Sequence, residues 1–181
     1  MTARLYFDDP DVGPARETSH PDFVRACEDR LFYDCTDDFG PFGNDDGADA
    51  LSRLEDWYRE GAKGTLRSFI DGMLQEWGMT IPDLATTDRE TVNEWLADEE
   101  LETALRAADN LVIAVAFGEA KITGKLDNGV AMLARAALDR EAIVFEHYSS
   151  RERAWPHAAS ANAAINVKRA ALEKLEKARA E

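Results

Sequence analysis

Apolar residues recur every three to four positions along most of this chain, which is the spacing that places them on one face of an α-helix. The first such stripe follows the His20-Pro21 pair and is expected to end near Tyr33. Further helices are predicted over residues 45–60, 65–77, 88–96, 101–121, 130–138 and 160–179. The pattern therefore predicts an all-α fold of about seven helices with little or no sheet, in a single compact domain spanning residues 1–181.

The helix predicted over residues 101–121 has the strongest pattern and should form the core. Leu101, Leu105 and Val112 recur at helical spacing, and residues 111–117 are apolar on every side. A buried strand is the competing interpretation, because β-branched residues gather there. The length of the segment and its alanines favour a helix.

Local signals mark where several elements begin and end. Residues 1–20 carry turn-forming residues and are expected to form a short extended arm. The run Thr87-Asp88-Arg89-Glu90 fits a capping box with Thr87 as the N-cap. Residues 143–145 either extend the helix before them or start a second short one. A polar break over residues 151–156 is expected to precede the C-terminal helix.

Residues 34–47, here called the central turn, join the first predicted helix to the second. Gly40-Pro41 ends any helix, because proline lacks a backbone N–H and glycine is flexible. Asn44 or Asp45 then supplies the side-chain oxygen that caps the next helix. We interpret the central turn as a joint that reverses the chain and caps the helices on either side.

The acidic side chains of the central turn have two interpretations. In the first, Asp34, Thr36 and Asp37 cap the preceding helix or tie the turn by bonding backbone N–H groups, while Phe39 and Phe42 anchor it to the core. In the second, four carboxylates supply oxygen ligands to Ca²⁺ or Mg²⁺. The spacing does not fit an EF-hand loop, so the first interpretation is favoured and no cofactor is expected. The candidate ligands of the second are Asp34, Asp37, Asp38 and Asp45.

A family resemblance rests on the two halves of this region, Tyr33-Asp34-Cys35-Thr36-Asp37-Asp38 and Pro41-Phe42-Gly43-Asn44-Asp45-Asp46-Gly47, with His20-Pro21 ahead of them and Trp57 after them. Residues 20–60 thus resemble the uncharacterised bacterial YfeS-like proteins. The resemblance implies no known activity. Some relatives carry the label of a regulator of molybdate metabolism, which the resemblance makes one alternative here.

The charge of the chain limits its partners. The formal net charge is −15, which argues against binding nucleic acid or anionic lipid, because both need a field of Lys and Arg. Residues 1–60 have a net charge of −10 and residues 151–181 of +3, so the two ends could attract each other within one chain or in a homo-oligomer. The longest apolar run has seven residues, and the N-terminus does not resemble a signal peptide. We therefore expect a cytoplasmic protein.

No arrangement of residues typical of catalysis stands out. Cys27 falls on an apolar stripe and is expected to be a core thiol, and the aspartates around Cys35 would raise its pKa, which argues against a catalytic cysteine. His20 is expected to begin a helix. The alternative is a metal-dependent enzyme in which carboxylates of the central turn converge with His20, and these would be Asp34, Asp37 and Asp45.

The sequence thus favours a protein-binding or regulatory module without catalytic activity, with an unknown protein as partner. An acidic protein that mimics DNA, or an immunity-type protein, is a further alternative and would need exposed carboxylates spaced like phosphates. A binder would need an exposed aromatic or apolar patch beside the central turn, and Trp155-Pro156-His157 is the best candidate for an exposed contact. The predicted partner-binding or structural motif comprises His20, Asp34, Thr36, Asp37, Phe39, Pro41, Phe42, Asn44, Asp45 and Trp57.

Overall fold

The computed structural model describes residues 4–151 and 155–180. Within these ranges the chain forms seven α-helices and one 3₁₀-helix, and it contains no β-strand. The all-α prediction is therefore confirmed. No helix in these ranges combines the length and the apolar character needed to cross a membrane. The bounds are α1 Pro21–Ala26, η1 Arg30–Phe32, α2 Asp45–Arg59, α3 Leu66–Glu76, α4 Arg89–Trp95, α5 Glu99–Thr123, α6 Asn128–Arg151 and α7 Ala158–Ala180.

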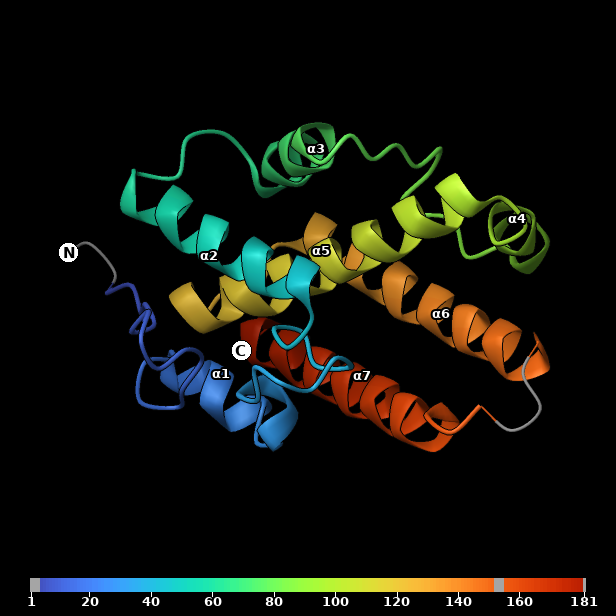
Figure 1. Cartoon of the computed structure of the whole chain (residues 1–181). Coiled ribbons are helices and arrows are strands. Elements are labelled where there is room, and N and C mark those ends of the chain that lie inside the picture. Colours follow the sequence, from blue (N-terminus) through green and yellow to red (C-terminus); the bar gives the residue numbers. More distant parts are fainter. Residues whose placement is uncertain (1–3, 152–154, 181) are drawn as a thin grey trace.

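Helix α5 is the central element of the fold and confirms the helical interpretation of residues 101–121. Figure 1 shows α5 crossing the middle of the molecule, and it contacts α1, α2, α3, α4 and α6. Residues 111–122 are all buried, as expected for a helix that is apolar on every side. Gly118 lets α2 approach closely, because a Cβ atom there would lie 2.9 Å from the Leu54 Cδ2 atom.

Helix α1 is shorter than predicted. It ends at Ala26 rather than near Tyr33, and a separate 3₁₀ turn over residues 30–32 follows it. Asp29 explains the break, because its carboxylate accepts a hydrogen bond from the Leu31 N–H (N–Oδ1 2.9 Å) and caps a new turn. A local side-chain cap therefore prevailed over the apolar stripe.

The N-cap of α4 also differs from the prediction. It is Asp88 rather than Thr87, because the Asp88 carboxylate accepts hydrogen bonds from the Thr91 backbone N–H (2.9 Å) and hydroxyl (2.7 Å). These two bonds lower the pKa of Asp88. A carboxylate is a stronger acceptor than a hydroxyl at the positive end of a helix, so the aspartate takes the cap position.

The two C-terminal helices are longer than predicted. Residues 143–145 extend α6 instead of starting a new helix, and α6 continues to Arg151. Helix α7 begins at Ala158, two residues earlier than expected. The predicted polar break falls in part on residues 152–154, which lie outside the described residues.

The N-terminal arm, described from residue 4 to residue 20, is attached to the end of α5. The backbone N–H of His20 donates to the Lys121 carbonyl (2.8 Å). The Lys121 ammonium is fully buried and pairs with the Asp8 carboxylate (Nζ–Oδ1 2.6 Å). A buried charge is unfavourable without a partner, so this pair holds the arm on the helix.

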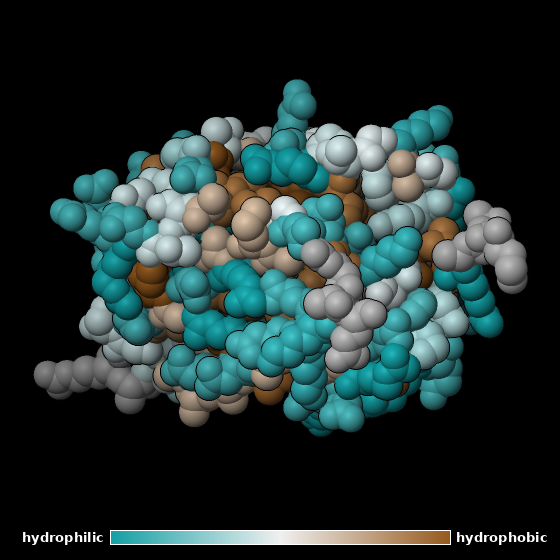
Figure 2. All heavy atoms as spheres, turned by 180° about the vertical axis from the view of Figure 1, so that it is seen from behind, coloured by the Kyte–Doolittle hydropathy of each residue, from teal (hydrophilic) through white to brown (hydrophobic). Residues whose placement is uncertain are grey.

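The outer surface carries few protruding apolar side chains. Figure 2 shows the face opposite to that of Figure 1, where hydrophilic residues dominate the lower half and apolar atoms are visible in the upper middle. Among the described residues, the large apolar side chains that are exposed are Val12 (69%) and Met132 (67%). Neither residue is aromatic, so an aromatic patch beside the central turn has to consist of partly buried side chains.

Candidate binding cleft

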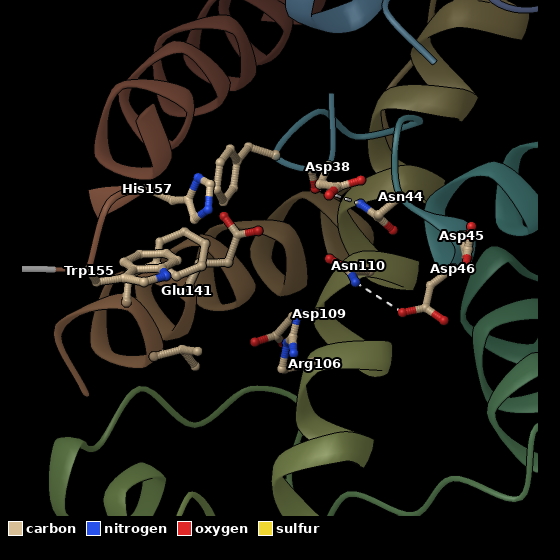
Figure 3. Close-up of a pocket in the computed structure, with 13 residues that line it drawn as sticks. Asp38, Asn44, Asp45, Asp46, Arg106, Asp109, Asn110, Glu141, Trp155 and His157 are labelled. Atoms are coloured by element: carbon tan, nitrogen blue, oxygen red, sulfur yellow. Dashed lines mark hydrogen bonds between the residues drawn. The ribbon is translucent and has the colours of Figure 1, made fainter. Parts of the chain in front are cut away.

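A cleft of about 510 Å³ opens beside the central turn. It lies where this turn and the first residues of α2 face α5, α6 and the residues just before α7 (Figure 3). We call it the acidic–aromatic cleft, because aromatic rings and carboxylates dominate its lining. Its rim carries Asp38, Asp45 and Asp46, and its aromatic wall is formed by Phe39, Phe145, Trp155 and His157.

The aromatic wall is a cluster of rings in mutual contact. The Phe145 and Trp155 rings lie 5.4 Å apart between centroids with an interplanar angle of 37°. Phe39 meets both of them edge to face, at 5.8 Å and 6.4 Å with interplanar angles of 85°. His157 adds a fourth ring, 5.9 Å from Trp155. The rings contact one another with no ligand between them, so the wall is already formed in this structure.

Phe39 does not have the role predicted for it. Phe42 is 2% exposed and belongs to the core cluster, as expected of an anchor. Phe39 is only half-buried and faces the cleft instead. The prediction treated the two as equivalent because sequence spacing in an irregular turn does not tell which way each side chain points.

The rim brings together carboxylates from the central turn and the first turn of α2. Asp46 accepts a hydrogen bond from the Asn110 amide (Nδ2–Oδ2 3.0 Å) on α5. Asp38 and Asp45 are exposed, and neither forms an ion pair within the described part of the chain. Asp45 and Asp46 lie in the first turn of α2, at the positive end of its dipole.

The central turn is held by its own polar side chains. The Asp34 carboxylate accepts hydrogen bonds from the Thr36 hydroxyl (2.6 Å) and backbone N–H (3.0 Å), which lower the pKa of Asp34. Asp37 accepts from the Phe39 N–H (3.1 Å), and Asn44 caps α2 by accepting from the Gly47 N–H (2.8 Å). These bonds fit the structural interpretation of the acids, and they position the two cleft residues Asp38 and Phe39.

A buried ion pair forms the floor of the cleft on the α5 side. The Asp109 carboxylate, 3% exposed as a residue, is paired with Arg140 of α6 (Nη2–Oδ1 2.6 Å). Arg140 also donates to the carbonyls of Leu84 (2.7 Å) and Thr86 (2.8 Å). Burial raises the pKa of Asp109 to about 7, against the opposing effect of Arg140. The sequence prediction missed this pair, although Asp109 lies four residues after Leu105 and three before Val112 on the apolar stripe, which was a visible signal.

A second pair neutralises the α6 side of the floor. Glu141 receives two hydrogen bonds from the Lys168 ammonium of α7 (2.7 and 2.8 Å). Arg106 also lines the cleft, and its guanidinium lies over the Tyr148 ring, 5.8 Å from the centroid. The two floor pairs are thus close to neutral, Arg106 adds one positive charge beside them, and the exposed negative charge of the cleft is concentrated on its rim.

Three of the ten residues of the predicted motif line the cleft, namely Phe39, Asn44 and Asp45, and the other seven do not: His20, Asp34, Thr36, Asp37, Pro41, Phe42 and Trp57. His20 caps α1 by accepting a hydrogen bond from the Asp22 N–H (N–Nδ1 3.2 Å), and its ring packs edge to face on Tyr6. Trp57 donates its indole N–H to the Lys63 carbonyl (3.1 Å). Both have local structural roles. Pro41 is also buried, so only part of the motif reaches the cleft.

The convergence that a metal-dependent enzyme would need is not found in the described part of the chain. There, no group of three or more His, Cys, Asp or Glu side chains is arranged to hold a metal ion. Cys27 is buried, and burial raises the pKa of its thiol well above the ordinary value, while Cys35 is exposed. The prediction of a core thiol at Cys27 is confirmed.

The fold and the cleft together define an all-α protein with an acidic, structured turn between its first two helices. The chain is 33% identical over 141 residues to the uncharacterised protein YfeS of Escherichia coli (strain K12), and the alignment covers 77% of this chain. The resemblance to the YfeS-like proteins is thereby confirmed. The matched region amounts to 57% of the length of that curated relative. No known family description and no solved structure matches the chain.

Proposed function

We propose that this chain is a protein-binding module without catalytic activity, and that it binds a basic segment of a partner protein in the acidic–aromatic cleft. The observation that carries this proposal is the lining of the cleft, in which a preformed wall of four rings faces a rim of three aspartates. Rigid aromatic side chains are frequent anchors of protein interfaces. The rim and the net charge of −15 attract a cationic partner and raise its association rate.

The charge pairs on the floor argue for binding rather than catalysis. Asp109 and Glu141 are the acids nearest the floor, and each is held by a cation from a neighbouring helix. The raised pKa of Asp109 would suit a general base, but the side chain is buried and both of its oxygens accept hydrogen bonds from the Arg140 guanidinium, so it is poorly placed to take a proton from a ligand. Glu141 is engaged in the same way by the Lys168 ammonium. These acids therefore support the shape of the cleft.

Two alternatives receive less support from the same geometry. A protein that mimics DNA would present its carboxylates on a protruding surface, whereas the rim here borders a concave site with an aromatic wall. A role in molybdate metabolism, the label carried by some relatives, would act through a partner protein, because molybdate is an anion and the rim repels anions.

Affinity capture followed by titration of the purified partner tests the proposal. The tagged full chain is used to capture cross-linked partners from a cell extract, and the dissociation constant is then measured with the purified candidate. The Asp38→Asn/Asp45→Asn variant removes two rim charges, and the Glu60→Gln/Glu94→Gln control removes two charges from exposed positions outside the cleft.

We expect the rim variant to weaken binding by about 10-fold or more, because charge-assisted hydrogen bonds are each worth roughly 1.5–3 kcal/mol. The control should bind like the unmodified chain. If the rim variant binds the partner as tightly as the control variant does, the partner does not use the cleft and the proposal is wrong.

A further inference from the structure

The acidic–aromatic cleft combines the two chemical features that a guanidinium group uses for binding. Planar guanidinium groups stack on aromatic faces, and they bond carboxylates through two parallel N–H donors. We propose that the cleft recognises an arginine side chain of the partner segment, with the guanidinium between the aromatic wall and the rim aspartates. This inference rests on the proposed function, and it names the chemical group that enters the site.

The arrangement of the wall and the rim fits a flat cation. Figure 3 shows Trp155 and His157 on one side of the cleft, and Asp45 and Asp46 on the other. Trp155 and Phe145 have similar ring orientations, since their planes differ by 37°. At 5.4 Å between centroids the two rings stack at a tilt, and a planar group can lie against the exposed part of this pair while its N–H groups point towards the rim.

The charges of the cleft favour a cation and leave room for one. Asp109 and Glu141 are already compensated by Arg140 and Lys168, so they add little net charge. Asp38 and Asp45 form no ion pair within the described residues and are available to a ligand. Because rings shield one side of the site from water, a carboxylate–guanidinium pair there is stronger than one on an open surface.

Arginine fits better than lysine for two physical reasons. Its guanidinium is weakly hydrated and loses less on leaving water, whereas the compact ammonium of lysine is strongly hydrated. Its five N–H donors can bond a rim carboxylate through two parallel bonds while its plane lies against a ring, and an ammonium has only three donors and no flat face. The cleft volume of about 510 Å³ lies within the usual range for ligand sites, so it can also hold residues flanking the arginine.

Short blocked peptides of the form Gly-Gly-X-Gly-Gly test this inference without knowledge of the partner. X is arginine, lysine or citrulline, the last being a neutral molecule of nearly the same shape as arginine. Each peptide is titrated into the ¹⁵N-labelled full chain, and the NMR shifts of the Trp155 indole and of the rim amides are followed. For the arginine peptide we expect a dissociation constant of roughly 0.1–3 mM, as suits a single side chain.

Variants of the wall and the rim give the matching readouts. We expect the affinity for the arginine peptide to fall by about 5-fold or more in Trp155→Ala and in Asp38→Asn/Asp45→Asn. The Glu60→Gln/Glu94→Gln control should bind the peptide like the unmodified chain. The rim aspartates are exposed, so their replacement tests the inference even if the tryptophan variant folds poorly. Lysine should bind about 3-fold more weakly than arginine, and citrulline about 10-fold or more.

The outcomes separate this inference from the proposed function. Equal binding of arginine and citrulline, equal binding of arginine and lysine, or no shift at about 10 mM arginine peptide would overturn arginine recognition. If arginine recognition is overturned but the Asp38→Asn/Asp45→Asn variant still binds the captured partner protein more weakly, the proposed function stands and a different chemical group enters the cleft. Arginine-specific shifts without any partner that depends on the cleft would instead overturn the proposed function and leave this inference in place.

Discussion

The buried ion pair beneath the cleft allows one prediction to be worked out from the structure. Arg140→Met removes the guanidinium and keeps a side chain of similar length. The Asp109 carboxylate then stays buried without a cation, and the Leu84 and Thr86 carbonyls lose the donors that reach them at 2.7 and 2.8 Å. Breaking one side of a buried pair costs about 3–5 kcal/mol, which is a large part of the roughly 5–15 kcal/mol that stabilises a domain.

A double variant separates the charge from the hydrogen bonds. Arg140→Met/Asp109→Leu removes the uncompensated carboxylate and leaves only the two carbonyls without their donor. We therefore expect the double variant to lose only about 1–3 kcal/mol, less than Arg140→Met alone. Urea unfolding followed by far-UV circular dichroism measures both free energies. Asp109→Leu is measured in the same way. A double variant whose loss equals the sum of the losses of Arg140→Met and Asp109→Leu would refute the reasoning, because the two residues would then be uncoupled.

The pH dependence gives an independent check on the same pair. Burial raises the pKa of Asp109 to about 7 in the folded chain, and removal of Arg140 takes away the effect that opposes this rise. A carboxyl with a raised pKa stabilises the fold below its unfolded pKa of about 3.9 and loses that contribution as the pH rises through the folded pKa. Arg140→Met should therefore be less destabilising at pH 5 than at pH 8. Equal losses at both pH values would contradict this account.

Three other predictions concern thiol burial, the cap of α2 and the anchoring of the central turn. A thiol reagent should modify Cys35 in the folded chain but reach Cys27 only after unfolding, because Cys27 is buried and burial raises the pKa of its thiol. A colorimetric assay in which both thiols of the folded chain react rapidly would contradict this. Asn44→Ala should lower the free energy of unfolding by about 1–2 kcal/mol through loss of the N-cap of α2. If urea unfolding gives a decrease of less than about 0.5 kcal/mol, the cap is dispensable. Phe42→Ala should lower the free energy of unfolding by about 3–5 kcal/mol, and Phe39→Ala by less than about 1.5 kcal/mol, because Phe39 is only half-buried. If thermal unfolding shows Phe39→Ala to be the more destabilising of the two, Phe39 is the anchor instead.

The helices could be predicted because their signal is local. Residues three and four apart share a helix face, so apolar spacing alone indicated the core helix α5 and most of the others. The errors fell where side chains compete for backbone N–H groups. Asp29 caps a separate turn and Asp88 displaces Thr87 as the cap of α4, and apolar spacing does not decide which of several neighbouring side chains takes a backbone N–H group.

The central turn shows the same division within a few residues. Its Asn44 cap and its ties at Asp34 and Asp37 span two to three positions, so sequence reasoning reached them. Phe39 was predicted to anchor the turn to the core. It contacts Phe145 and Trp155 instead, and these residues lie far from it in the sequence. An irregular turn has no fixed side-chain period that could have indicated this.

The sequence by itself determined an all-α chain with a buried central helix, a structured acidic turn and a strong negative charge. Only the tertiary structure decided which acids are available for binding. Asp109 and Glu141 are compensated because α6 and α7 bring Arg140 and Lys168 against them, whereas Asp38 and Asp45 are exposed. Whether a carboxylate is paired depends on which helices pack together, and helix packing joins residues that no local pattern connects.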